Sequence, residues 1–298
     1  MNITFRQLRL FLALAETGSV SAAAKLMHVT QPTASMQLKE VAQSVGLPLY
    51  ELIGRRVQLT DVGHELAATA RSIAQAWESF EQTVDSVQGL TRGRLRVAVV
   101  STAKYFMPRW IGSFCRRHPD IDLSLEVLNR DGVLQRLREG RDDFCIMSMP
   151  PQDVPLVDEV FMPNPIVVIA ASTDPLTKQK NVPLSEVLQR RFILREAGSG
   201  TRMAADRYFK KQRVQPTVRL ELGSNEAVKE AVAGGLGVGV ISLHALYGHQ
   251  KERGVSVVDV QGFPLASAWH LVHPRAKKLS PVAQAFKRHL LAQPRSPK

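Results

Sequence analysis

Apolar residues recur at helical spacing through the first part of the chain, and short polar turns interrupt them. A first helix is predicted from the apolar positions Phe5, Leu8, Phe11, Leu12 and Ala15. Thr4 and Gln7 form a capping box at its start, because each side chain can satisfy a free backbone N–H there. Gly18 supplies a left-handed stop for this helix.

Two further helices are predicted after this stop. Ser21 is the expected cap of a helix over residues 22–27, and its small residues allow another helix to come close. A tight turn at residues 28–29 follows. Thr30 then caps a third helix, in whose first turn Pro32 costs little because no N–H is needed there. This order predicts a helix-turn-helix, and an ordinary three-helix bundle with a polar outer face is the alternative.

Short polar side chains occupy the start of the third helix, which in a helix-turn-helix enters the major groove of DNA. β-prone runs at 49–52 and 57–59 follow, so that two arginines lie at the tip of a predicted hairpin, or wing. Arginine at such a tip can contact phosphate or enter the minor groove, although a solvated turn is the alternative. The residues predicted to contact DNA are Ser21, Gln31, Pro32, Thr33, Ser35, Met36, Lys39, Arg55 and Arg56.

A long helix is predicted from Thr60 to about residue 89, with apolar residues separated alternately by four and three positions. Such a heptad seam needs a partner to cover it. We predict that it pairs two copies of the chain, and packing against the chain's own core is the alternative. Two paired heads predict a pseudo-palindromic operator. The residues assigned to dimerisation are Leu66, Ile73, Trp77, Phe80 and Val84.

Predicted strands and helices alternate from residue 92 onward, which indicates an α/β fold with parallel-type sheets. A first group comprises strands at 95–100, 121–127 and 143–147 and helices at 101–117 and 133–139. A second group comprises strands at 166–170, 192–194, 217–221 and 238–241 and helices at 201–211 and 225–233. Strands at 255–260 and 268–272 and a helix at 281–291 complete the prediction.

Two of the predicted strand-to-helix connections carry hydroxyls, free backbone N–H groups and a nearby cation. They are Ser101-Thr102-Ala103-Lys104 and Gly198-Ser199-Gly200-Thr201-Arg202. Helix N-termini bind anions through their free donors and their dipole. Facing each other across a cleft, the two connections would hold a carboxylate or phosphate from both sides. The alternative is that Ser101 and Ser199 only cap their helices.

The motifs of the first part resemble the N-terminal domain of LysR-type transcriptional regulators. The matching stretches are Phe5-Arg6-Gln7-Leu8, Gly18-Ser19-Val20-Ser21-Ala22-Ala23-Ala24, Thr30-Gln31-Pro32, Ser35, Gly46-Leu47-Pro48-Leu49, Arg55 and Leu59-Thr60 with Gly63. The resemblance implies a winged helix-turn-helix at 1–60 and a dimerisation linker helix at 61–89. It also implies a two-lobed domain like periplasmic binding proteins, with lobe I at 92–162 plus 266–298 and lobe II at 163–265.

The later motifs resemble the branch of this family that controls carbon-dioxide-fixation operons, the CbbR type. They are residues 100–106, Asn129-Arg130, Pro163-Asn164-Pro165, residues 195–202, 222–226 and 234–237. The resemblance implies a small anionic effector, such as a sugar phosphate, phosphoglycolate or nicotinamide nucleotide, and a dimer of dimers. RNA polymerase is a candidate partner, and a carboxylate-responsive regulator of another metabolic operon is the alternative. The residues assigned to the effector are Ser101, Thr102, Ala103, Lys104, Asn129, Arg130, Met149, Arg195, Gly198, Ser199, Gly200, Thr201, Arg202 and Asn225.

Composition narrows the function without pointing to DNA by itself. The net charge is +12, but residues 1–90 hold 7 Lys/Arg and 8 Asp/Glu, so the basic excess lies in the C-terminal part. There it fits an anionic ligand, accessory DNA contact or a plain basic surface. The two cysteines have no metal-like spacing, and no membrane-spanning run or signal-peptide pattern is seen, which favours a cytoplasmic protein and excludes an exported solute-binding protein.

An α/β enzyme with an adaptor at its N-terminus is the remote alternative, and three features argue against it. Gly235-Leu236-Gly237 follows a predicted helix and precedes a strand, the reverse of the dinucleotide-binding order. Ser199 has Ala197 where a nucleophile elbow requires glycine. His270 and His273 lie on opposite faces of a predicted strand, which makes them poor co-ligands of a metal. No catalytic residue, metal site or cofactor is therefore predicted.

Overall fold

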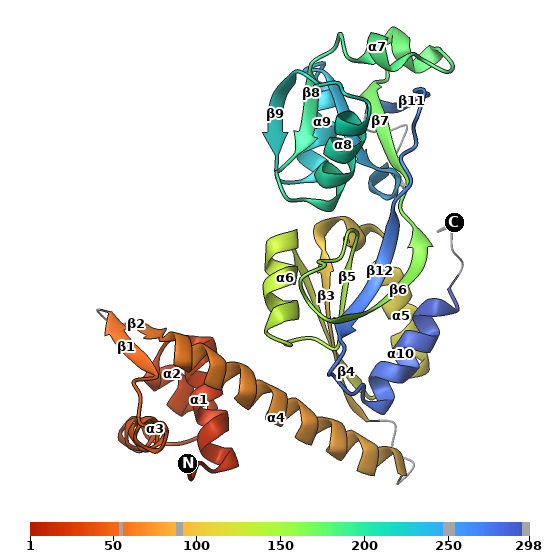
Figure 1. The fold of residues 1–298 in the computed structure, drawn as a ribbon. Coiled ribbons are helices and arrows are strands. Elements are labelled where there is room, and N and C mark those ends of the chain that lie inside the picture. Colours follow the sequence, from red (N-terminus) through yellow and green to blue (C-terminus); the bar gives the residue numbers. More distant parts are fainter. Residues whose placement is uncertain (54–55, 88–91, 247–253, 294–298) are drawn as a thin grey trace. The chain divides into compact units, whose positions relative to one another are not determined.

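The computed structural model describes residues 1–298 except 54–55, 88–91, 247–253 and 294–298. The chain forms two compact units, an N-terminal one of residues 1–90 with 139–141 and a C-terminal one of residues 91–138 with 142–298, and each is described by itself (Figure 1). None of the helices in the described residues combines the length and apolar character that a membrane crossing requires.

The N-terminal unit is three helices, a hairpin and one long helix. Its elements are α1 (Phe5–Thr17), α2 (Val20–Leu26), α3 (Gln31–Val45), β1 (Tyr50–Ile53), β2 (Arg56–Leu59) and α4 (Asp61–Val87). The helices enclose a core that includes Leu10, Phe11, Leu14 and Leu38, all with at most 1% of their surface exposed. The strands β1 and β2 pair antiparallel. The predicted winged helix-turn-helix fold is confirmed.

The helix ends of this unit follow the predicted caps with one exception. The Thr4–Gln7 capping box is present, and Gly18 ends α1 with φ of 62°. The Thr30 side chain accepts a hydrogen bond from the Thr33 N–H. The prediction that Ser21 caps α2 is wrong, because extended Ser19 accepts from the Ala22 N–H and the helix begins at Val20. Ser21 therefore lies inside the first turn, where it is exposed.

The C-terminal unit contains two five-stranded sheets, one in each of two lobes, lobe I and lobe II. In lobe I the order is β4 (Ile121–Leu128), β3 (Gly93–Val100), β5 (Phe144–Met147), β12 (Ala268–Pro274) and β6 (Leu156–Pro163). In lobe II it is β11 (Val255–Val258), β7 (Ile166–Ala171), β10 (Val238–Ser242), β8 (Phe192–Arg195) and β9 (Val218–Leu222).

Both sheets are mixed, which corrects the prediction of parallel-type sheets. The strands β3, β4 and β5 are parallel, but β12 is antiparallel to β5 and β6. Likewise β8, β9 and β10 are parallel, whereas β7 is antiparallel to both of its neighbours, β10 and β11. The chain passes between the lobes twice, from β6 into β7 and from β11 back to β12. The strand β6 was not predicted.

Helices cover the sheets of both lobes. Lobe I has the 3-10 helix η1 (Ser101–Tyr105), α5 (Met107–Arg117), α6 (Arg130–Arg138) and α10 (Pro281–Leu291). Lobe II has η2 (Pro175–Lys178), α7 (Leu184–Val187), α8 (Gly200–Lys211), α9 (Asn225–Ala233) and η3 (Leu243–Leu246). The single helix predicted over 101–117 is wrong. It breaks at Phe106, and Pro108, which has no N–H to continue an earlier turn, lies in the first turn of α5.

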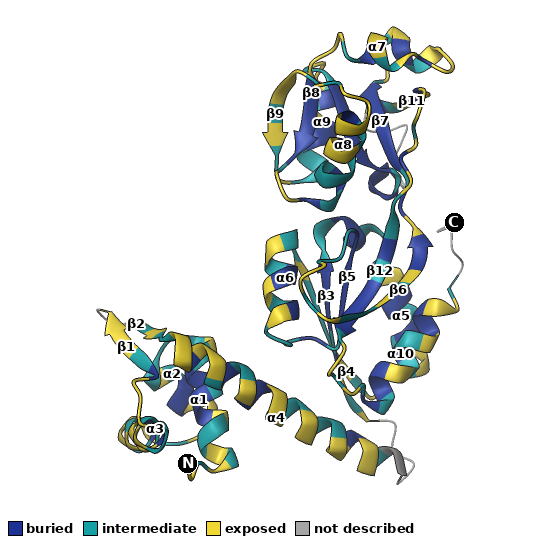
Figure 2. Ribbon diagram, viewed as in Figure 1, coloured by how far each residue is buried: buried dark blue, intermediate teal, exposed yellow. Residues whose placement is uncertain are grey.

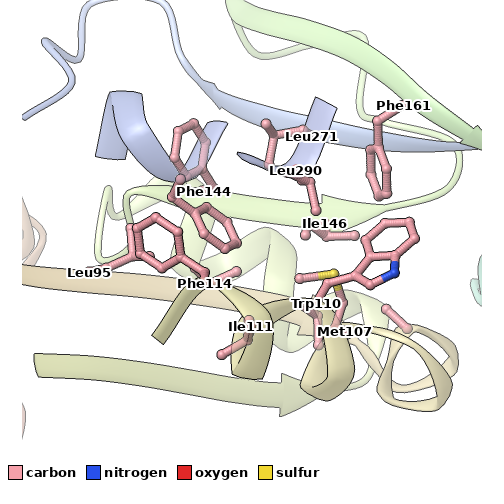
Figure 3. Close-up of a cluster of buried hydrophobic side chains, with 14 of the residues drawn as sticks. Leu95, Met107, Trp110, Ile111, Phe114, Phe144, Ile146, Phe161, Leu271 and Leu290 are labelled. Carbon is pink, nitrogen blue, oxygen red and sulfur yellow. The ribbon is translucent and has the colours of Figure 1, made fainter. Parts of the chain in front are cut away.

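The largest apolar core fills lobe I between its sheet and helices (Figure 3). Phe114 of α5 packs edge-on against Phe286 of α10, with ring centroids 5.2 Å apart. Lobe II has its own core, in which Phe192 of β8 packs edge-on against Phe209 of α8. Each sheet is thus anchored by a buried core, which holds the ends of its strands in place. The polar residues that line the cavity between the lobes follow these strand ends.

Candidate functional site

A small polar cavity lies between lobe I and lobe II at the carboxyl ends of β3, β5 and β8, where ligands of open α/β sheets bind. Its volume is about 20 Å³, room for about one water molecule. The residues that line it are Val100, Ser101, Thr102, Arg130, Ser148, Asn164, Arg195, Glu196, Ser199, Gly200, Thr201 and Trp269. Both predicted strand-to-helix connections contribute to it.

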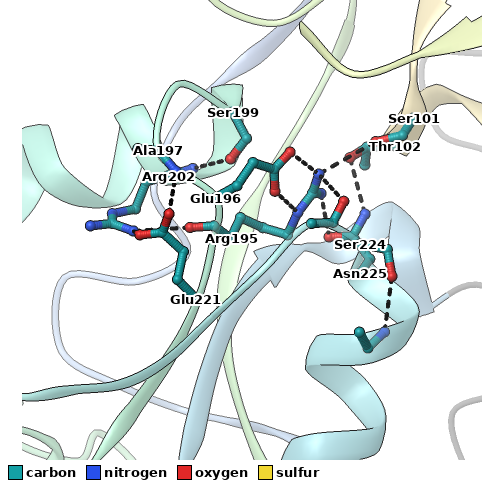
Figure 4. Close-up of polar contacts among 12 residues, drawn as sticks. Ser101, Thr102, Arg195, Glu196, Ala197, Ser199, Arg202, Glu221, Ser224 and Asn225 are labelled. Atoms are coloured by element: carbon teal, nitrogen blue, oxygen red, sulfur yellow. Dashed lines mark hydrogen bonds and ion pairs between the residues drawn. The ribbon is translucent and has the colours of Figure 1, made fainter.

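Arg195 is the centre of the hydrogen-bond network around this cavity (Figure 4). Its side chain is buried, and its Nε and Nη2 donate to the two carboxylate oxygens of Glu196 at 2.7 and 2.8 Å. Its Nη1 donates to Asn225 Oδ1 at 3.0 Å, and its Nη2 reaches Ser101 Oγ at 3.4 Å. Arg195 is thus already held by a carboxylate and spans from lobe II to lobe I.

Further hydrogen bonds join η1 of lobe I to the start of α9 in lobe II. Asn225 Nδ2 donates to Thr102 Oγ1 at 3.0 Å, and Lys104 Nζ lies 3.1 Å from Glu226 Oε2. Tyr105 donates its hydroxyl proton to Glu226 as well. Burial would raise the pKa of Glu226, but the hydrogen bonds from Tyr105 and Lys104 outweigh it and lower the pKa to about 2. These contacts hold the lobes together over the cavity.

Arg130 is the second cation of the cavity, and it differs from Arg195 in its partners. Its Nη2 donates to the Met149 carbonyl at 2.8 Å, whereas its buried Nε has no hydrogen-bond partner in the described part of the chain. Burial lowers the pKa of Arg130, because a charged group loses hydration there. The Arg130 guanidinium therefore retains donor capacity for a bound anion.

The other residues assigned to the effector lie outside the cavity lining. Ala103 is in the core of lobe I, and Asn129 Oδ1 accepts from the Gly132 N–H at the start of α6. Gly198 is exposed, with φ of 86°. Arg202 forms ion pairs with Asp206 and Glu221 at 2.9 and 2.7 Å, so its charge is engaged beside the cavity. The assigned residues Lys104, Met149 and Asn225 act through the contacts given above.

Five lining residues were missed by the sequence analysis: Val100, Ser148, Asn164, Glu196 and Trp269. Ser148 and Glu196 each precede or follow an assigned residue in the sequence, and Asn164 lies within the Pro163-Asn164-Pro165 motif. Those positions carried a signal that could have been used. Trp269 carried none, because it reaches the cavity from β12, more than a hundred residues beyond the other lobe I residues that line it.

The predicted DNA-contacting residues that the structure describes lie on α2, on α3 and at the start of β2. Gln31, Pro32, Met36 and Lys39 are exposed on α3, and Thr33 and Ser35 are half-buried. The Gln31 amide donates to Ser35 Oγ at 3.2 Å, which orients both side chains. Arg56 is exposed at the start of β2, and Arg55 lies outside the described residues.

The predicted dimerisation seam lies on α4, a helix along which exposed residues recur (Figure 2). Ile73, Trp77, Phe80 and Val84 have exposed fractions of 41%, 52%, 57% and 37%. The Trp77 ring contacts both Phe80 and Phe5 of α1, with centroids 5.7 and 6.0 Å apart. Leu66 instead packs against the core of the N-terminal unit. We call the exposed residues Ile73, Trp77, Phe80 and Val84 the α4 strip.

Comparison with known proteins accounts for both units. Residues 5–64 match the bacterial regulatory helix-turn-helix protein of the lysR family, and residues 88–295 match the LysR substrate binding domain. The chain belongs to the LysR family of transcriptional regulators. The family assignment made from the sequence is confirmed, and so is the expected combination of a winged helix-turn-helix with a two-lobed α/β domain.

Relatives of this LysR-family chain match it along almost its full length. The HTH-type transcriptional activator CmpR of Synechocystis is 40% identical over 98% of this chain and 96% of CmpR. The RuBisCO operon transcriptional regulator of Acidithiobacillus ferrooxidans is 41% identical over 98% of this chain and 94% of that regulator. Both are regulators of transcription and neither is named as an enzyme.

A solved structure matches the C-terminal unit. The regulatory domain of Synechocystis CcmR, in complex with 2-PG, is 41% identical and superimposes with a TM-score of 0.65. The match covers 67% of this chain and 97% of that domain.

Proposed function

We propose that this LysR-family protein activates transcription of a carbon-fixation-related operon in response to a small phosphorylated carboxylate such as 2-phosphoglycolate. Support for the gene class comes from CmpR and the RuBisCO operon regulator, which match it end to end. Support for the effector class comes from the CcmR domain bound to 2-PG and from the two cations that line the cavity. The protein would work in the cytoplasm, on double-stranded DNA.

The cavity offers three kinds of anion donor. Arg130 supplies a guanidinium without a carboxylate partner in the described residues. The 12-residue helix α8 begins at the cavity, so the N–H groups of Gly200 and Thr201 have no partner within the helix. Ser101 and Thr102 add hydroxyls from lobe I. A phosphate with three acceptor oxygens can use donors from both lobes at once.

The lobes must separate to admit such a ligand, because the present volume holds about one water molecule. The ligand would then replace direct contacts between lobes with contacts through itself, and so change the favoured lobe arrangement. A ligand shifts a conformational equilibrium only by its differential affinity for the two states. Coupling of that shift to DNA would pass through an oligomer that carries paired DNA-binding heads.

The oligomer we propose is a dimer of dimers on a pseudo-palindromic operator. The α4 strip would pair two chains, and the exposed residues at the start of α3 would read base edges in the major groove. Arg55 and Arg56 of the wing would contact the backbone or minor groove. RNA polymerase would be recruited or repositioned by the same complex.

Calorimetric titration of the full chain tests the effector class. The ligands are 2-phosphoglycolate, glycolate, which lacks the phosphate, and inorganic phosphate, which lacks the carboxylate. We expect 2-phosphoglycolate to bind most tightly, and Arg130→Gln to weaken it at least about 10-fold, because a hydrogen-bonded charge pair is lost. Arg207→Gln is the control, since it removes the same charge from an exposed position on α8. Preference for an unphosphorylated carboxylate would instead favour a regulator of another metabolic operon.

A further inference from the structure

Trp269 lines the cavity, and it carries a buried donor that has no partner among the described residues. The residue is completely buried near the start of β12, and its Nε1 has no hydrogen-bond partner in the described part of the chain. Almost all buried polar groups in folded proteins are paired, because an unmade hydrogen bond leaves the cost of desolvation uncompensated. Trp269 Nε1 therefore needs a partner that the described chain does not supply.

The Trp269 ring is held in place by its neighbours. It packs edge-on against Phe106, with centroids 5.1 Å apart, and against His244, with centroids 6.0 Å apart. The His244 Nε2 is in turn within hydrogen-bond distance of the Pro163 carbonyl, at 2.9 Å. The indole thus lies among the core of lobe I and the two segments that cross between lobes, so its N–H cannot turn outward to find water.

The chemistry of the unpaired groups specifies the kind of ligand. Two buried side-chain atoms of the cavity-lining residues have no hydrogen-bond partner in the described chain, Trp269 Nε1 and Arg130 Nε. Both atoms are donors. Asn164, which could have offered an acceptor, instead receives the Ser242 hydroxyl on its Oδ1 at 2.6 Å. An oxyanion has only acceptors to offer, and it can satisfy both donors. A ligand that presents an ammonium group here has no acceptor to offer and would leave both of them unpaired.

We propose that Trp269 is a specificity-determining residue of the effector site, whose indole N–H donates to an oxygen of the bound oxyanion. This rests on the proposed function, in which the cavity takes an anionic effector. The Trp269 ring also contacts His244, which lies beside Pro163, where the chain passes from lobe I to lobe II. An oxygen bound to the indole N–H would therefore lie close to this connection between the lobes. Trp269 then selects acceptor-rich ligands in a way that the cations, which attract any anion, do not.

The Trp269→Phe substitution separates this role from packing. Phenylalanine keeps an aromatic ring in the core but removes the N–H. In the free protein no hydrogen bond is lost, so the melting temperature should fall only by the amount that a smaller buried ring costs. In the complex a hydrogen bond to a charged group is lost, so affinity for 2-phosphoglycolate should fall on the order of 10-fold. Trp110→Phe is the matched control, because Trp110 packs on Phe106 in the same core but does not line the cavity.

The experiment is calorimetric titration of the full chain and both variants with 2-phosphoglycolate, together with ¹⁵N-indole spectra of the free and bound protein. Support requires weaker binding by Trp269→Phe only, and a ligand-induced shift of the indole resonance that this variant lacks. Equal affinity of Trp269→Phe and the parent chain would overturn the inference and leave the proposed function standing. That result is expected if a buried water, and not the ligand, accepts the hydrogen bond from the indole N–H. A resonance that ligand does not move would also overturn it. No binding by the parent chain would refute the proposed function and this inference together.

Discussion

Arg195 and Glu196, neighbours in the sequence, form an ion pair with two hydrogen bonds of 2.7 and 2.8 Å at the wall of the cavity. The paired edge of the guanidinium is the edge that binds carboxylates and phosphates most strongly. In this conformation the chain's own carboxylate therefore occupies it. An incoming anion meets Glu196 both as a competitor for Arg195 and as a like charge.

The Glu196→Gln substitution should tighten binding of 2-phosphoglycolate on the order of 10-fold, because it removes a like charge from the cavity wall. Glutamine can still accept one hydrogen bond from Arg195, so the arginine should stay in position. Calorimetric titration measures the change. The control is Glu186→Gln, an exposed residue of lobe II. Equal or weaker binding by Glu196→Gln would mean that Glu196 does not oppose the anion.

Gly200 and Ser148 set how closely the lobes approach at the cavity. A Cβ added to Gly200 would lie 2.2 Å from Ser148 Oγ, a distance that side chains cannot adopt without movement. Gly200→Ala should therefore hold the lobes apart and reduce the thermal stabilisation that saturating 2-phosphoglycolate gives. The reduction should be measured by differential scanning fluorimetry.

Two further variants control this prediction. Gly223→Ala adds a methyl to the same lobe in open space, so it should behave as the parent chain. Ser148→Ala combined with Gly200→Ala should restore part of the stabilisation, because the atom in the clash is the Ser148 hydroxyl oxygen. A Gly200→Ala protein that responds to ligand as the parent does would show that the lobes need not approach here.

Glu226 should make the contact between lobes pH-dependent. Its pKa falls to about 2 in the folded chain, from 4.5, so its contribution to stability is fully present above pH 4.5 and is lost as the pH falls through 2. Glu226→Gln should lower the melting temperature at pH 7 by about 2 °C, as expected for a partly exposed ion pair. The difference should remain constant down to about pH 5 and narrow below it.

The matched control for this pH series is Glu230→Gln, an exposed residue of the same helix, which should show no difference at any of these pH values. A difference between the Glu226→Gln and parent melting temperatures that widens towards acidic pH would contradict the assignment, since it would mean that the glutamate is more stable protonated in the folded chain.

The α4 strip should support self-association of the protein. Phe80→Glu places a charge where a second copy would bury an aromatic ring. We therefore expect the affinity of self-association to fall at least about 10-fold. Leu47→Glu is the control, because Leu47 is exposed to a similar degree, 51% against 57%, but lies off α4. Sedimentation velocity distinguishes the species. An unaltered distribution for Phe80→Glu would remove the α4 strip from the interface.

Local signals in the sequence were sufficient where the cause of a structure is local. The capping box at Thr4, the left-handed stop at Gly18 and the bounds of α9 and α10 depend on neighbouring residues, and they were predicted as observed. Two serines two positions apart were not separable, because either Ser19 or Ser21 can cap a helix. The backbone of Ser19, which is extended, decides between them.

Contacts between distant segments were beyond local reasoning. Arg202 has the sequence context of an anion receptor, but Glu221 binds it because β9 lies beside β8. Trp269 reaches the cavity only because β12 returns to lobe I beside the outgoing segment, where the Asn164 N–H donates to the Ser267 carbonyl at 2.8 Å. Neither contact could be predicted from the spacing of residues along the chain or from its composition.

Hydroxyl-radical footprinting with and without 2-phosphoglycolate tests the central claim, that effector binding between the lobes alters the grip on DNA. The operator would be a duplex selected from random sequence by the ligand-free protein, and ligand binding would be verified by calorimetry under the same conditions. The account predicts a pseudo-palindromic protected region whose pattern or extent changes when the ligand is added. An identical footprint and an identical DNA affinity, with the effector bound, would contradict it.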